Sequence, residues 1–194
     1  MAILDVIKYG HPTLRTVAEP VNPAEIDKKF LKDMMDTMLE EDGVGLAANQ
    51  VNVLQRIIVV TDFEHTYTLF NPEIIAYSEN VEHGNEGCLS LPGLQASVPR
   101  HEKVVVRAMN EEGEQIEIKA KGLLAIVLQH EIDHLNGTLY IDRADLSTLN
   151  WVDNDPESGL PINKNALLDE IQGIYQDRFH QNKKAVVFEP QIKE

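Results

Sequence analysis

The sequence predicts an α+β fold in which antiparallel or mixed strands pack around a central metal-binding helix, with further helices near the N-terminal and C-terminal ends. Three observations support this prediction. Apolar residues recur at three- and four-residue intervals in two outer segments, 23–42 and 163–179. Short β-branched runs and a hairpin turn lie between them. Residues 123–137 combine an apolar helical stretch with an HExxH pattern, whose two histidines share one helix face.

The first predicted helix covers residues 23–42. Pro23 suits the first turn of a helix, because proline lacks an N–H that would stay unpaired there. Gly43 suits the C-terminal cap, where the backbone often becomes left-handed. The apolar face of this helix comprises Ile26, Phe30, Leu31, Met34, Met35, Met38 and Leu39.

Four strands are predicted in the middle of the chain, and the HExxH helix follows them. The segment 110–113, Asn-Glu-Glu-Gly, is typical of a hairpin turn between the last two strands. The helix is expected to begin near Gly122 and to end at residues 136–137, Asn-Gly, which form a helix stop signal. The four strand runs are residues 56–60, 67–70, 103–109 and 114–120.

The C-terminal part of the chain has a different pattern. Residues 145–163 are rich in Asn, Asp, Ser, Pro and Gly and have no sustained period, which predicts a long loop. Helical spacing returns at 163–179, and the last dozen residues offer few apolar anchors, so we expect a mobile tail. We therefore expect a single domain at 1–145 that holds the HExxH site, followed by residues 146–194 as loop, helix and tail.

Composition narrows the class of function. A formal charge of −15 and a pI of about 4.8 argue against direct nucleic-acid binding, which needs clustered Lys and Arg to neutralise phosphates. The N-terminal residues lack the basic segment and apolar run of a signal peptide, and no apolar stretch is long enough to span a bilayer. We therefore expect a cytoplasmic protein, without membrane contact, that acts on small molecules, peptides or basic partners.

The HExxH pattern offers a metal ion two ligands, His130 and His134, with Glu131 beside them as a base. A surface helix with two histidines is the alternative. Leu123, Ile126 and Val127 place an apolar face one and two turns before the histidines, which favours the metal site. Catalytic sites of this kind usually take a third protein ligand and keep one position for water.

Cys88 is the only cysteine, so the chain has no intramolecular disulfide. A lone cysteine is more often a small buried hydrophobic residue than a ligand or nucleophile. Its surroundings favour the second interpretation, because Cys88 follows a glycine within "NEGCLSLPG", residues 85–93, a stretch flanked by turn-forming residues.

Three motifs together resemble the signature motifs of the peptide deformylases: "GVGLAANQ" (43–50), "EGCLS" (86–90) and "QHEIDHLNG" (129–137). The resemblance runs from about residue 3 to 145, so 1–145 is the expected catalytic domain. It implies that Cys88 is the third ligand of a divalent ion. A thiolate with two imidazoles suits iron, zinc, cobalt or nickel. Fe²⁺ is the ion expected from the resemblance, with Zn²⁺, Ni²⁺ or Co²⁺ as alternatives.

The resemblance also implies a reaction and a substrate. Glu131 would accept a proton from the attacking water, while the Gln50 side-chain amide and the Leu89 N–H would donate to the developing oxyanion. The substrate would be a nascent polypeptide with N-formylmethionine at its N-terminus, and formate would be released. Transient association with the ribosome would fit such a substrate. The residues expected to contact substrate are Val44, Gly45, Gly87, Leu123, Ile126 and Val127.

Two supporting roles and one departure concern the surroundings of the site. The resemblance suggests that Glu86 pairs with Arg100 to brace the Cys88 segment. Asp133 could orient a histidine or could simply be solvated, and the sequence leaves both open. Residues 84–85, Gly-Asn, are less apolar than in many relatives, which puts one wall of the methionine pocket in question.

Two other functions compete with a deformylase. A general metallopeptidase would take a His or Glu ligand downstream of the helix, but no suitable His-containing motif follows His134. A noncatalytic protein with a structural metal would close the site with four protein ligands, and the sequence offers only three convincing ones.

Overall fold

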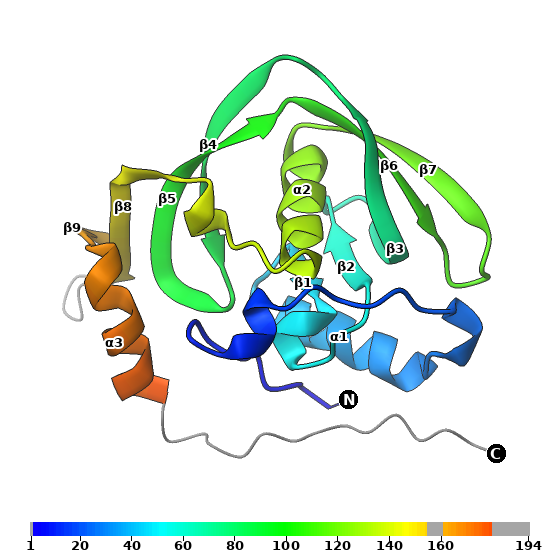
Figure 1. Cartoon of the computed structure of the whole chain (residues 1–194), viewed down its shortest axis with the longest axis horizontal. Coiled ribbons are helices and arrows are strands. Elements are labelled where there is room, and N and C mark those ends of the chain that lie inside the picture. The colour runs from blue at the N-terminus through cyan, green and yellow to red at the C-terminus, as the bar shows by residue number, and fades with distance from the viewer. Residues whose placement is uncertain (1, 155–160, 180–194) are drawn as a thin grey trace.

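Two antiparallel sheets face a central helix, α2 (Leu123–Leu135), in the computed structural model, which describes residues 2–154 and 161–179. Figure 1 shows α2 between the sheets, with α1 (Lys28–Glu40) below it and α3 (Leu168–Phe179) beside the second sheet. The architecture is a mixture of helices and antiparallel sheets, as the α+β prediction requires. No helix among the described residues is long and apolar enough to cross a bilayer.

The first sheet has five strands in the order β1-β2-β3-β6-β7, and the second has four in the order β4-β5-β8-β9. The strands of the first sheet are β1 (Gly45–Ala47), β2 (Ile57–Thr61), β3 (Thr66–Tyr77), β6 (Lys103–Met109) and β7 (Gln115–Lys121). Those of the second are β4 (Val81–Cys88), β5 (Leu91–His101), β8 (Asp145–Asn154) and β9 (Pro161–Asn165).

The four strands predicted from β-branched runs are present as β2, β3, β6 and β7. The expected hairpin turn joins β6 to β7: Asn110 N–H donates to the Glu114 carbonyl at 2.9 Å, and Gly113 has a φ of +79°. β3 extends beyond the predicted run to Tyr77, and the sequence did not predict β1, β4 or β5. These strands lack a long β-branched run, so pairing with neighbours specifies them.

Two direct strand-to-strand connections pass side by side between the sheets, where β3 leads into β4 and β5 leads into β6. Backbone hydrogen bonds hold the two crossings together: Ser78 N–H donates to the Lys103 carbonyl at 2.9 Å, and Glu102 N–H to the Asn80 carbonyl at 3.0 Å. The Tyr77 and His101 rings stack there with centroids 4.2 Å apart. The paired strands therefore bend around α2 (Figure 1).

Strand β2 is buried on both faces and separates two hydrophobic clusters. Ile58 and Val60 face α2, whereas Ile57 and Val59 face α1. An uninterrupted apolar run is the pattern expected of a strand covered on both sides. A third cluster joins β5, the 3-10 helix η4 (Tyr140–Asp142) and α3, through Ile171 and other apolar residues.

Helix α1 is shorter than predicted. The expected start at Pro23 is wrong for the α-helix: Pro23 begins a 3-10 turn, η2 (Pro23–Glu25), and α1 begins after Asp27, whose carboxylate caps it by accepting from Lys29 N–H at 2.8 Å. At the other end Asp42, not Gly43, has the left-handed conformation, with φ 54°. Gly43 instead closes the cap by donating its N–H to the Met38 carbonyl at 2.8 Å.

Helix α2 lies where the sequence placed it. Gly122 precedes the first residue, Leu123, and Asn136 follows the last, Leu135. Gly137 then takes a left-handed φ of +70°. The helix is almost wholly buried from Val127 onward, because both sheets and η3 (Ala48–Val51) contact it.

The predicted loop at 145–163 is wrong where the structure describes it. Residues 145–154 form β8, which pairs with β5, and 161–163 belong to β9, so the predicted helix at 163–179 begins only at Leu168. A polar side chain that suggested a loop pairs with a backbone group of the neighbouring strand instead: Thr148 Oγ1 accepts a hydrogen bond from the Ser97 N–H of β5 at 2.8 Å. Tertiary pairing thus overrides local propensity. The expected tail at residues 180–194 lies outside the described residues.

Candidate metal centre and active site

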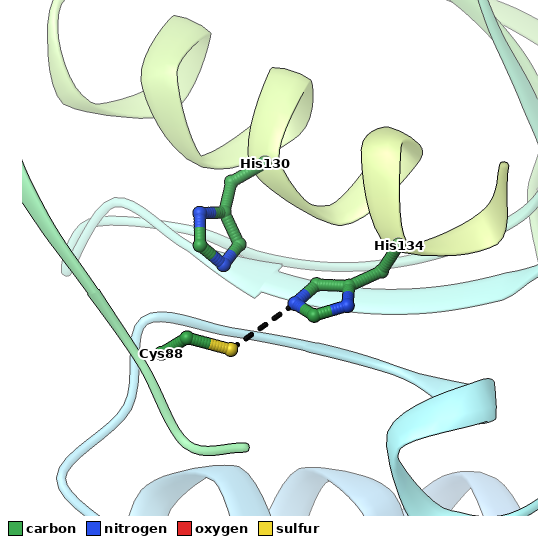
Figure 2. A group of neighbouring side chains, drawn as sticks. All are labelled: Cys88, His130 and His134. Carbon is green, nitrogen blue, oxygen red and sulfur yellow. Dashed lines mark hydrogen bonds between the residues drawn. The ribbon is translucent and has the colours of Figure 1, made fainter. Parts of the chain in front are cut away.

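Three potential metal ligands come together at one point, Cys88 from the end of β4 and His130 and His134 from α2 (Figure 2). Their ligand atoms all lie within 4.8 Å of one another, and Cys88 Sγ is 3.2 Å from His134 Nε2. Atoms that each lie about 2.0–2.3 Å from one ion must be this close together. The structure therefore brings the three predicted ligands into one cluster.

Local structure explains how each ligand reaches this point. The histidines are four residues apart on α2, so their side chains point to the same side of the helix. Cys88 pairs with Leu91 across a two-residue turn, and the β4–β5 register shifts just before it, between Glu86 and Cys88. This irregularity places Cys88 at the tip of the hairpin, facing α2 (Figure 2).

Glu86 orients the first histidine. Its Oε2 accepts from His130 Nδ1 at 2.8 Å, which leaves the other ring nitrogen for an ion. Both Glu86 oxygens also accept from Arg100, at 2.7 and 2.9 Å, so the pairing suggested by the resemblance is present. Burial acts to raise the pKa of Glu86, but hydrogen bonds from Arg100 and His130 outweigh it and lower the pKa below its usual value.

Asp133 contacts arginines. Its Oδ2 accepts from Arg100 at 2.6 Å, and both its oxygens accept from Arg143, at 2.6 and 2.7 Å. The solvated alternative that the sequence left open is therefore wrong, because Asp133 is buried. Among the described residues, it is Glu86, and not Asp133, that accepts a hydrogen bond from a histidine of the site.

The two histidines differ in their electrostatic surroundings. Burial acts to lower the pKa of His130, but hydrogen bonds to Cys88 and Glu86 outweigh it and raise that pKa well above its usual value. Burial lowers the pKa of His134 well below its usual value, which keeps that ring neutral, as a metal ligand must be. A sulfur with two imidazole nitrogens is a donor set suited to borderline divalent ions.

Glu131 is buried beside the ligands, and its Oε2 has no hydrogen-bond partner among the described residues. Burial raises the pKa of Glu131 to about 7. A carboxyl group with such a pKa can both accept and release a proton near neutral pH. The backbone of Gly45 packs directly on this carboxylate, since a Cβ at Gly45 would lie only 2.8 Å from Glu131 Cδ.

The Gln50 side chain is fixed with its NH₂ group toward the ligands. Its Oε1 accepts from Ala47 N–H at 2.8 Å, while Nε2 lies 3.5 Å from Cys88 Sγ and 3.3 Å from Ser90 Oγ. Only 1% of Gln50 is exposed. Leu89 lies in the turn that follows Cys88. Its carbonyl accepts from Lys8 Nζ at 3.0 Å.

The residues expected to contact substrate fall into two groups. Val44 and Val127 pack in the cluster between α2 and the first sheet. Leu123, 42% exposed, lies two turns before His130 and Ile126 one turn before it, so both present apolar surface on the histidine side of α2. Gly87 is at an exposed position of β4, directly before Cys88.

Sequence reasoning missed two residues at this site. Ser90, which receives a hydrogen bond from Gln50, belongs to the motif "EGCLS", so the motif itself was a signal. Lys8 precedes every motif, and nothing in its surrounding sequence marks it. Its proximity to Leu89 follows only from the folded arrangement.

Comparison with known proteins agrees with this geometry. The polypeptide deformylase family model matches residues 3–150. A peptide deformylase of Azotobacter vinelandii is 43% identical over 153 residues, which cover 77% of this chain and 90% of the relative. A crystal structure of class I type b peptide deformylase from Acinetobacter baumannii has 38% identity and a TM-score of 0.71, covering 74% of this chain and all of that one.

A second structure of the Acinetobacter baumannii enzyme, described as bound to Met-Ala-Ser, has 36% identity and a TM-score of 0.68 and covers 73% of this chain and 98% of that one. The resemblance inferred from the three motifs is thereby confirmed. The chain belongs to the polypeptide deformylase family, metal-dependent hydrolases that remove the N-formyl group from the N-terminal methionine of newly made polypeptides and release formate.

Proposed function

We propose that Cys88, His130 and His134 hold the divalent metal ion of this enzyme and that Glu131, Gln50 and Leu89 carry out the deformylation around it. The observation that carries the proposal is the convergence of the three ligand atoms beside a buried carboxylate with one unpartnered oxygen. Helix α2 is then the central metal-binding helix of the fold. The soft sulfur and two imidazoles fit Fe²⁺, with Zn²⁺, Ni²⁺ and Co²⁺ as alternatives.

Glu131 acts as the proton carrier. When bound, the ion supplies Lewis acidity, which makes water a better nucleophile near neutral pH and polarises the formyl oxygen. The Glu131 carboxylate accepts the proton of the attacking water and then delivers it to the departing amine. Its pKa near 7 suits both transfers. Gly45 lies against the carboxylate without a side chain, since a Cβ there would come within 2.8 Å of Glu131 Cδ.

Gln50 and Leu89 stabilise the oxyanion. Ala47 fixes the Gln50 amide so that its NH₂ group faces Cys88, and the Leu89 N–H follows directly after that ligand. Donors held rigidly where negative charge develops are worth about 3 kcal/mol each in comparable hydrolases. Their fixed geometry requires no reorganisation during the reaction.

The methionine side chain of the substrate is proposed to lie against α2. Leu123 and Ile126 present apolar surface on the histidine side of the helix, with Val44 and Val127 beneath it, and Gly45 and Gly87 border the substrate backbone. The relative bound to Met-Ala-Ser supports recognition of an N-terminal methionine. Gly84 leaves this wall open, because a Cβ there would meet only Ile126 Cδ1, at 4.0 Å.

Three wider proposals follow from the reaction. Residues 1–145 carry the catalytic machinery, since all proposed site residues lie there, and 146–194 are accessory. The enzyme acts in the cytoplasm, where formylated chains are made, and it associates transiently with the ribosome. Cosedimentation with ribosomes that display formyl-Met chains, compared with empty ribosomes, would test the association. If the enzyme pellets with neither kind of ribosome, the association is rejected.

Glu131→Gln is the direct test of the proposed mechanism. The amide keeps the volume of the side chain but cannot accept a proton, so turnover of formyl-Met-Ala-Ser should nearly vanish while metal content stays unchanged. Formate release and metal per chain would be measured together. Glu40→Gln, an exposed change at the end of α1, is the matched control and should behave as wild type. Retained activity in Glu131→Gln would reject the proton-carrier role.

A further inference from the structure

We propose that the N-terminal segment Ile7–Tyr9 is a positioning element that joins the two oxyanion donors, with Lys8 as its positioning residue. This inference rests on the roles proposed above for Gln50 and Leu89. Three hydrogen bonds carry it. Ile7 N–H donates to the Gln50 carbonyl at 2.8 Å, Lys8 Nζ to the Leu89 carbonyl at 3.0 Å, and Tyr9 N–H to the Ser90 carbonyl at 2.9 Å.

The two donors come from separate parts of the fold and need a link. Gln50 is in η3, whereas Leu89 is in the turn between β4 and β5. The ladder of these strands ends at the Cys88–Leu91 pair, so the Leu89 and Ser90 carbonyls lie beyond it and need other donors. Lys8 and Tyr9 provide them, and thereby fix the Leu89–Ser90 and Ser90–Leu91 peptide planes, which directly follow the plane that carries the Leu89 N–H.

The segment is anchored firmly enough to act as a rigid reference. Before it, Ala2 N–H donates to Asp33 at 3.1 Å and Leu4 N–H to Thr37 Oγ1 at 2.8 Å, which ties the chain to α1. After it, Leu14 is buried in the cluster with β5 and η4. A site keeps its geometry only when its supporting contacts are themselves held in place.

Lys8 contributes a charged hydrogen bond at the centre of the link. The side chain is half-buried, and burial lowers the pKa of its amine, although Glu41, Cys88 and Asp5 act in the opposite direction. Hydrogen bonds from a charged donor are stronger than those between neutral groups. The ammonium thus holds the Leu89–Ser90 peptide, next to the one that carries the Leu89 N–H, more tightly than the backbone contacts alone.

The test compares Lys8→Met, which removes the donor but keeps the length of the chain, with Lys8→Arg, which restores a charged donor. Lys119→Met, on the exposed face of β7, is the matched control. For each full-length enzyme kcat and KM on formyl-Met-Ala-Ser, metal content, the absorption spectrum of the cobalt form and the urea midpoint would be measured. If Lys8→Met does not fold, Lys8→Gln takes its place in the comparison.

We expect Lys8→Met to lower kcat roughly 10- to 100-fold, since small displacements of catalytic donors have effects of this size. KM, metal content and the cobalt spectrum should stay as in wild type, and Lys8→Arg should recover most of the lost kcat. Three outcomes would overturn the inference. Lys8→Met could lower the urea midpoint while kcat stays normal, it could change the cobalt spectrum, or Lys119→Met could lose as much kcat as Lys8→Met.

Gln50→Met separates this inference from the proposed mechanism. If Gln50→Met keeps its kcat, the oxyanion role of Gln50 is wrong, and the basis for the link falls with it. If Gln50→Met loses kcat while Lys8→Met does not, the oxyanion role stands and only the positioning role of Lys8 is rejected.

Discussion

Glu86 Oε2 accepts a hydrogen bond from His130 Nδ1 at 2.8 Å within the buried interior of the site. Glu86→Gln should therefore lower metal affinity by roughly 10- to 100-fold, because the imidazole loses the carboxylate that fixes its orientation. Competition with a chromophoric chelator would measure the affinity. Glu82→Gln, at an exposed position of the same strand, should leave the affinity unchanged. Equal affinities for both variants would show that Glu86 does not support the ligand.

The contact between Gly45 and Glu131 gives a second prediction. A methyl group at Gly45 would overlap the Glu131 carboxylate, so Gly45→Ala should lower kcat roughly 100-fold while the metal remains bound. Steady-state kinetics and metal analysis would be performed on the same preparation. Gly173→Ala is the control, because within the described residues a Cβ there would meet no heavy atom within 4 Å outside its own helix backbone and its chain neighbours. Wild-type kcat in Gly45→Ala would mean that the carboxylate can relocate without cost.

Asp133 is predicted to matter for stability more than for chemistry. Asp133→Asn removes the charge that faces buried Arg100 and should lower the free energy of unfolding by about 3 kcal/mol. Asp36→Asn breaks an ion pair with exposed Lys32 and should cost only about 0.5 kcal/mol. Urea unfolding of both metal-loaded variants would give the two values. A smaller loss for Asp133→Asn than for Asp36→Asn would contradict this ranking.

The last prediction concerns the acyl group. Formyl-Met peptides should be hydrolysed far faster than matched acetyl-Met peptides, and internal peptide bonds hardly at all. The reacting carbonyl must fit between the Gln50 amide and the Glu131 carboxylate, and the extra methyl group should cost about 1–3 kcal/mol through overpacking. An acetyl carbonyl is also the weaker electrophile. Values of kcat/KM on matched peptides, with the nickel or oxygen-protected iron form, would decide the question, and comparable rates would favour a general amidase.

The sequence by itself determined the elements whose signals are local. Helix α2 begins and ends at glycine and asparagine signals, and strands β2, β6 and β7 follow from β-branched runs. The spacing of His130 and His134 on one helix face needs no tertiary information. The three motifs, read together, were enough to identify the family, because their order and separation constrain the chain far more than any single motif.

Tertiary structure alone decided the features that depend on contact between distant segments. Strand β8 exists because β5 pairs with it, although its composition is that of a loop. A sequence cannot show that a Cβ at Gly45 would collide with Glu131, or that Glu86 and not Asp133 reaches a histidine. The contact of Lys8 with Leu89 is of the same kind. Each depends on where a side chain ends in space, which packing determines and residue order does not.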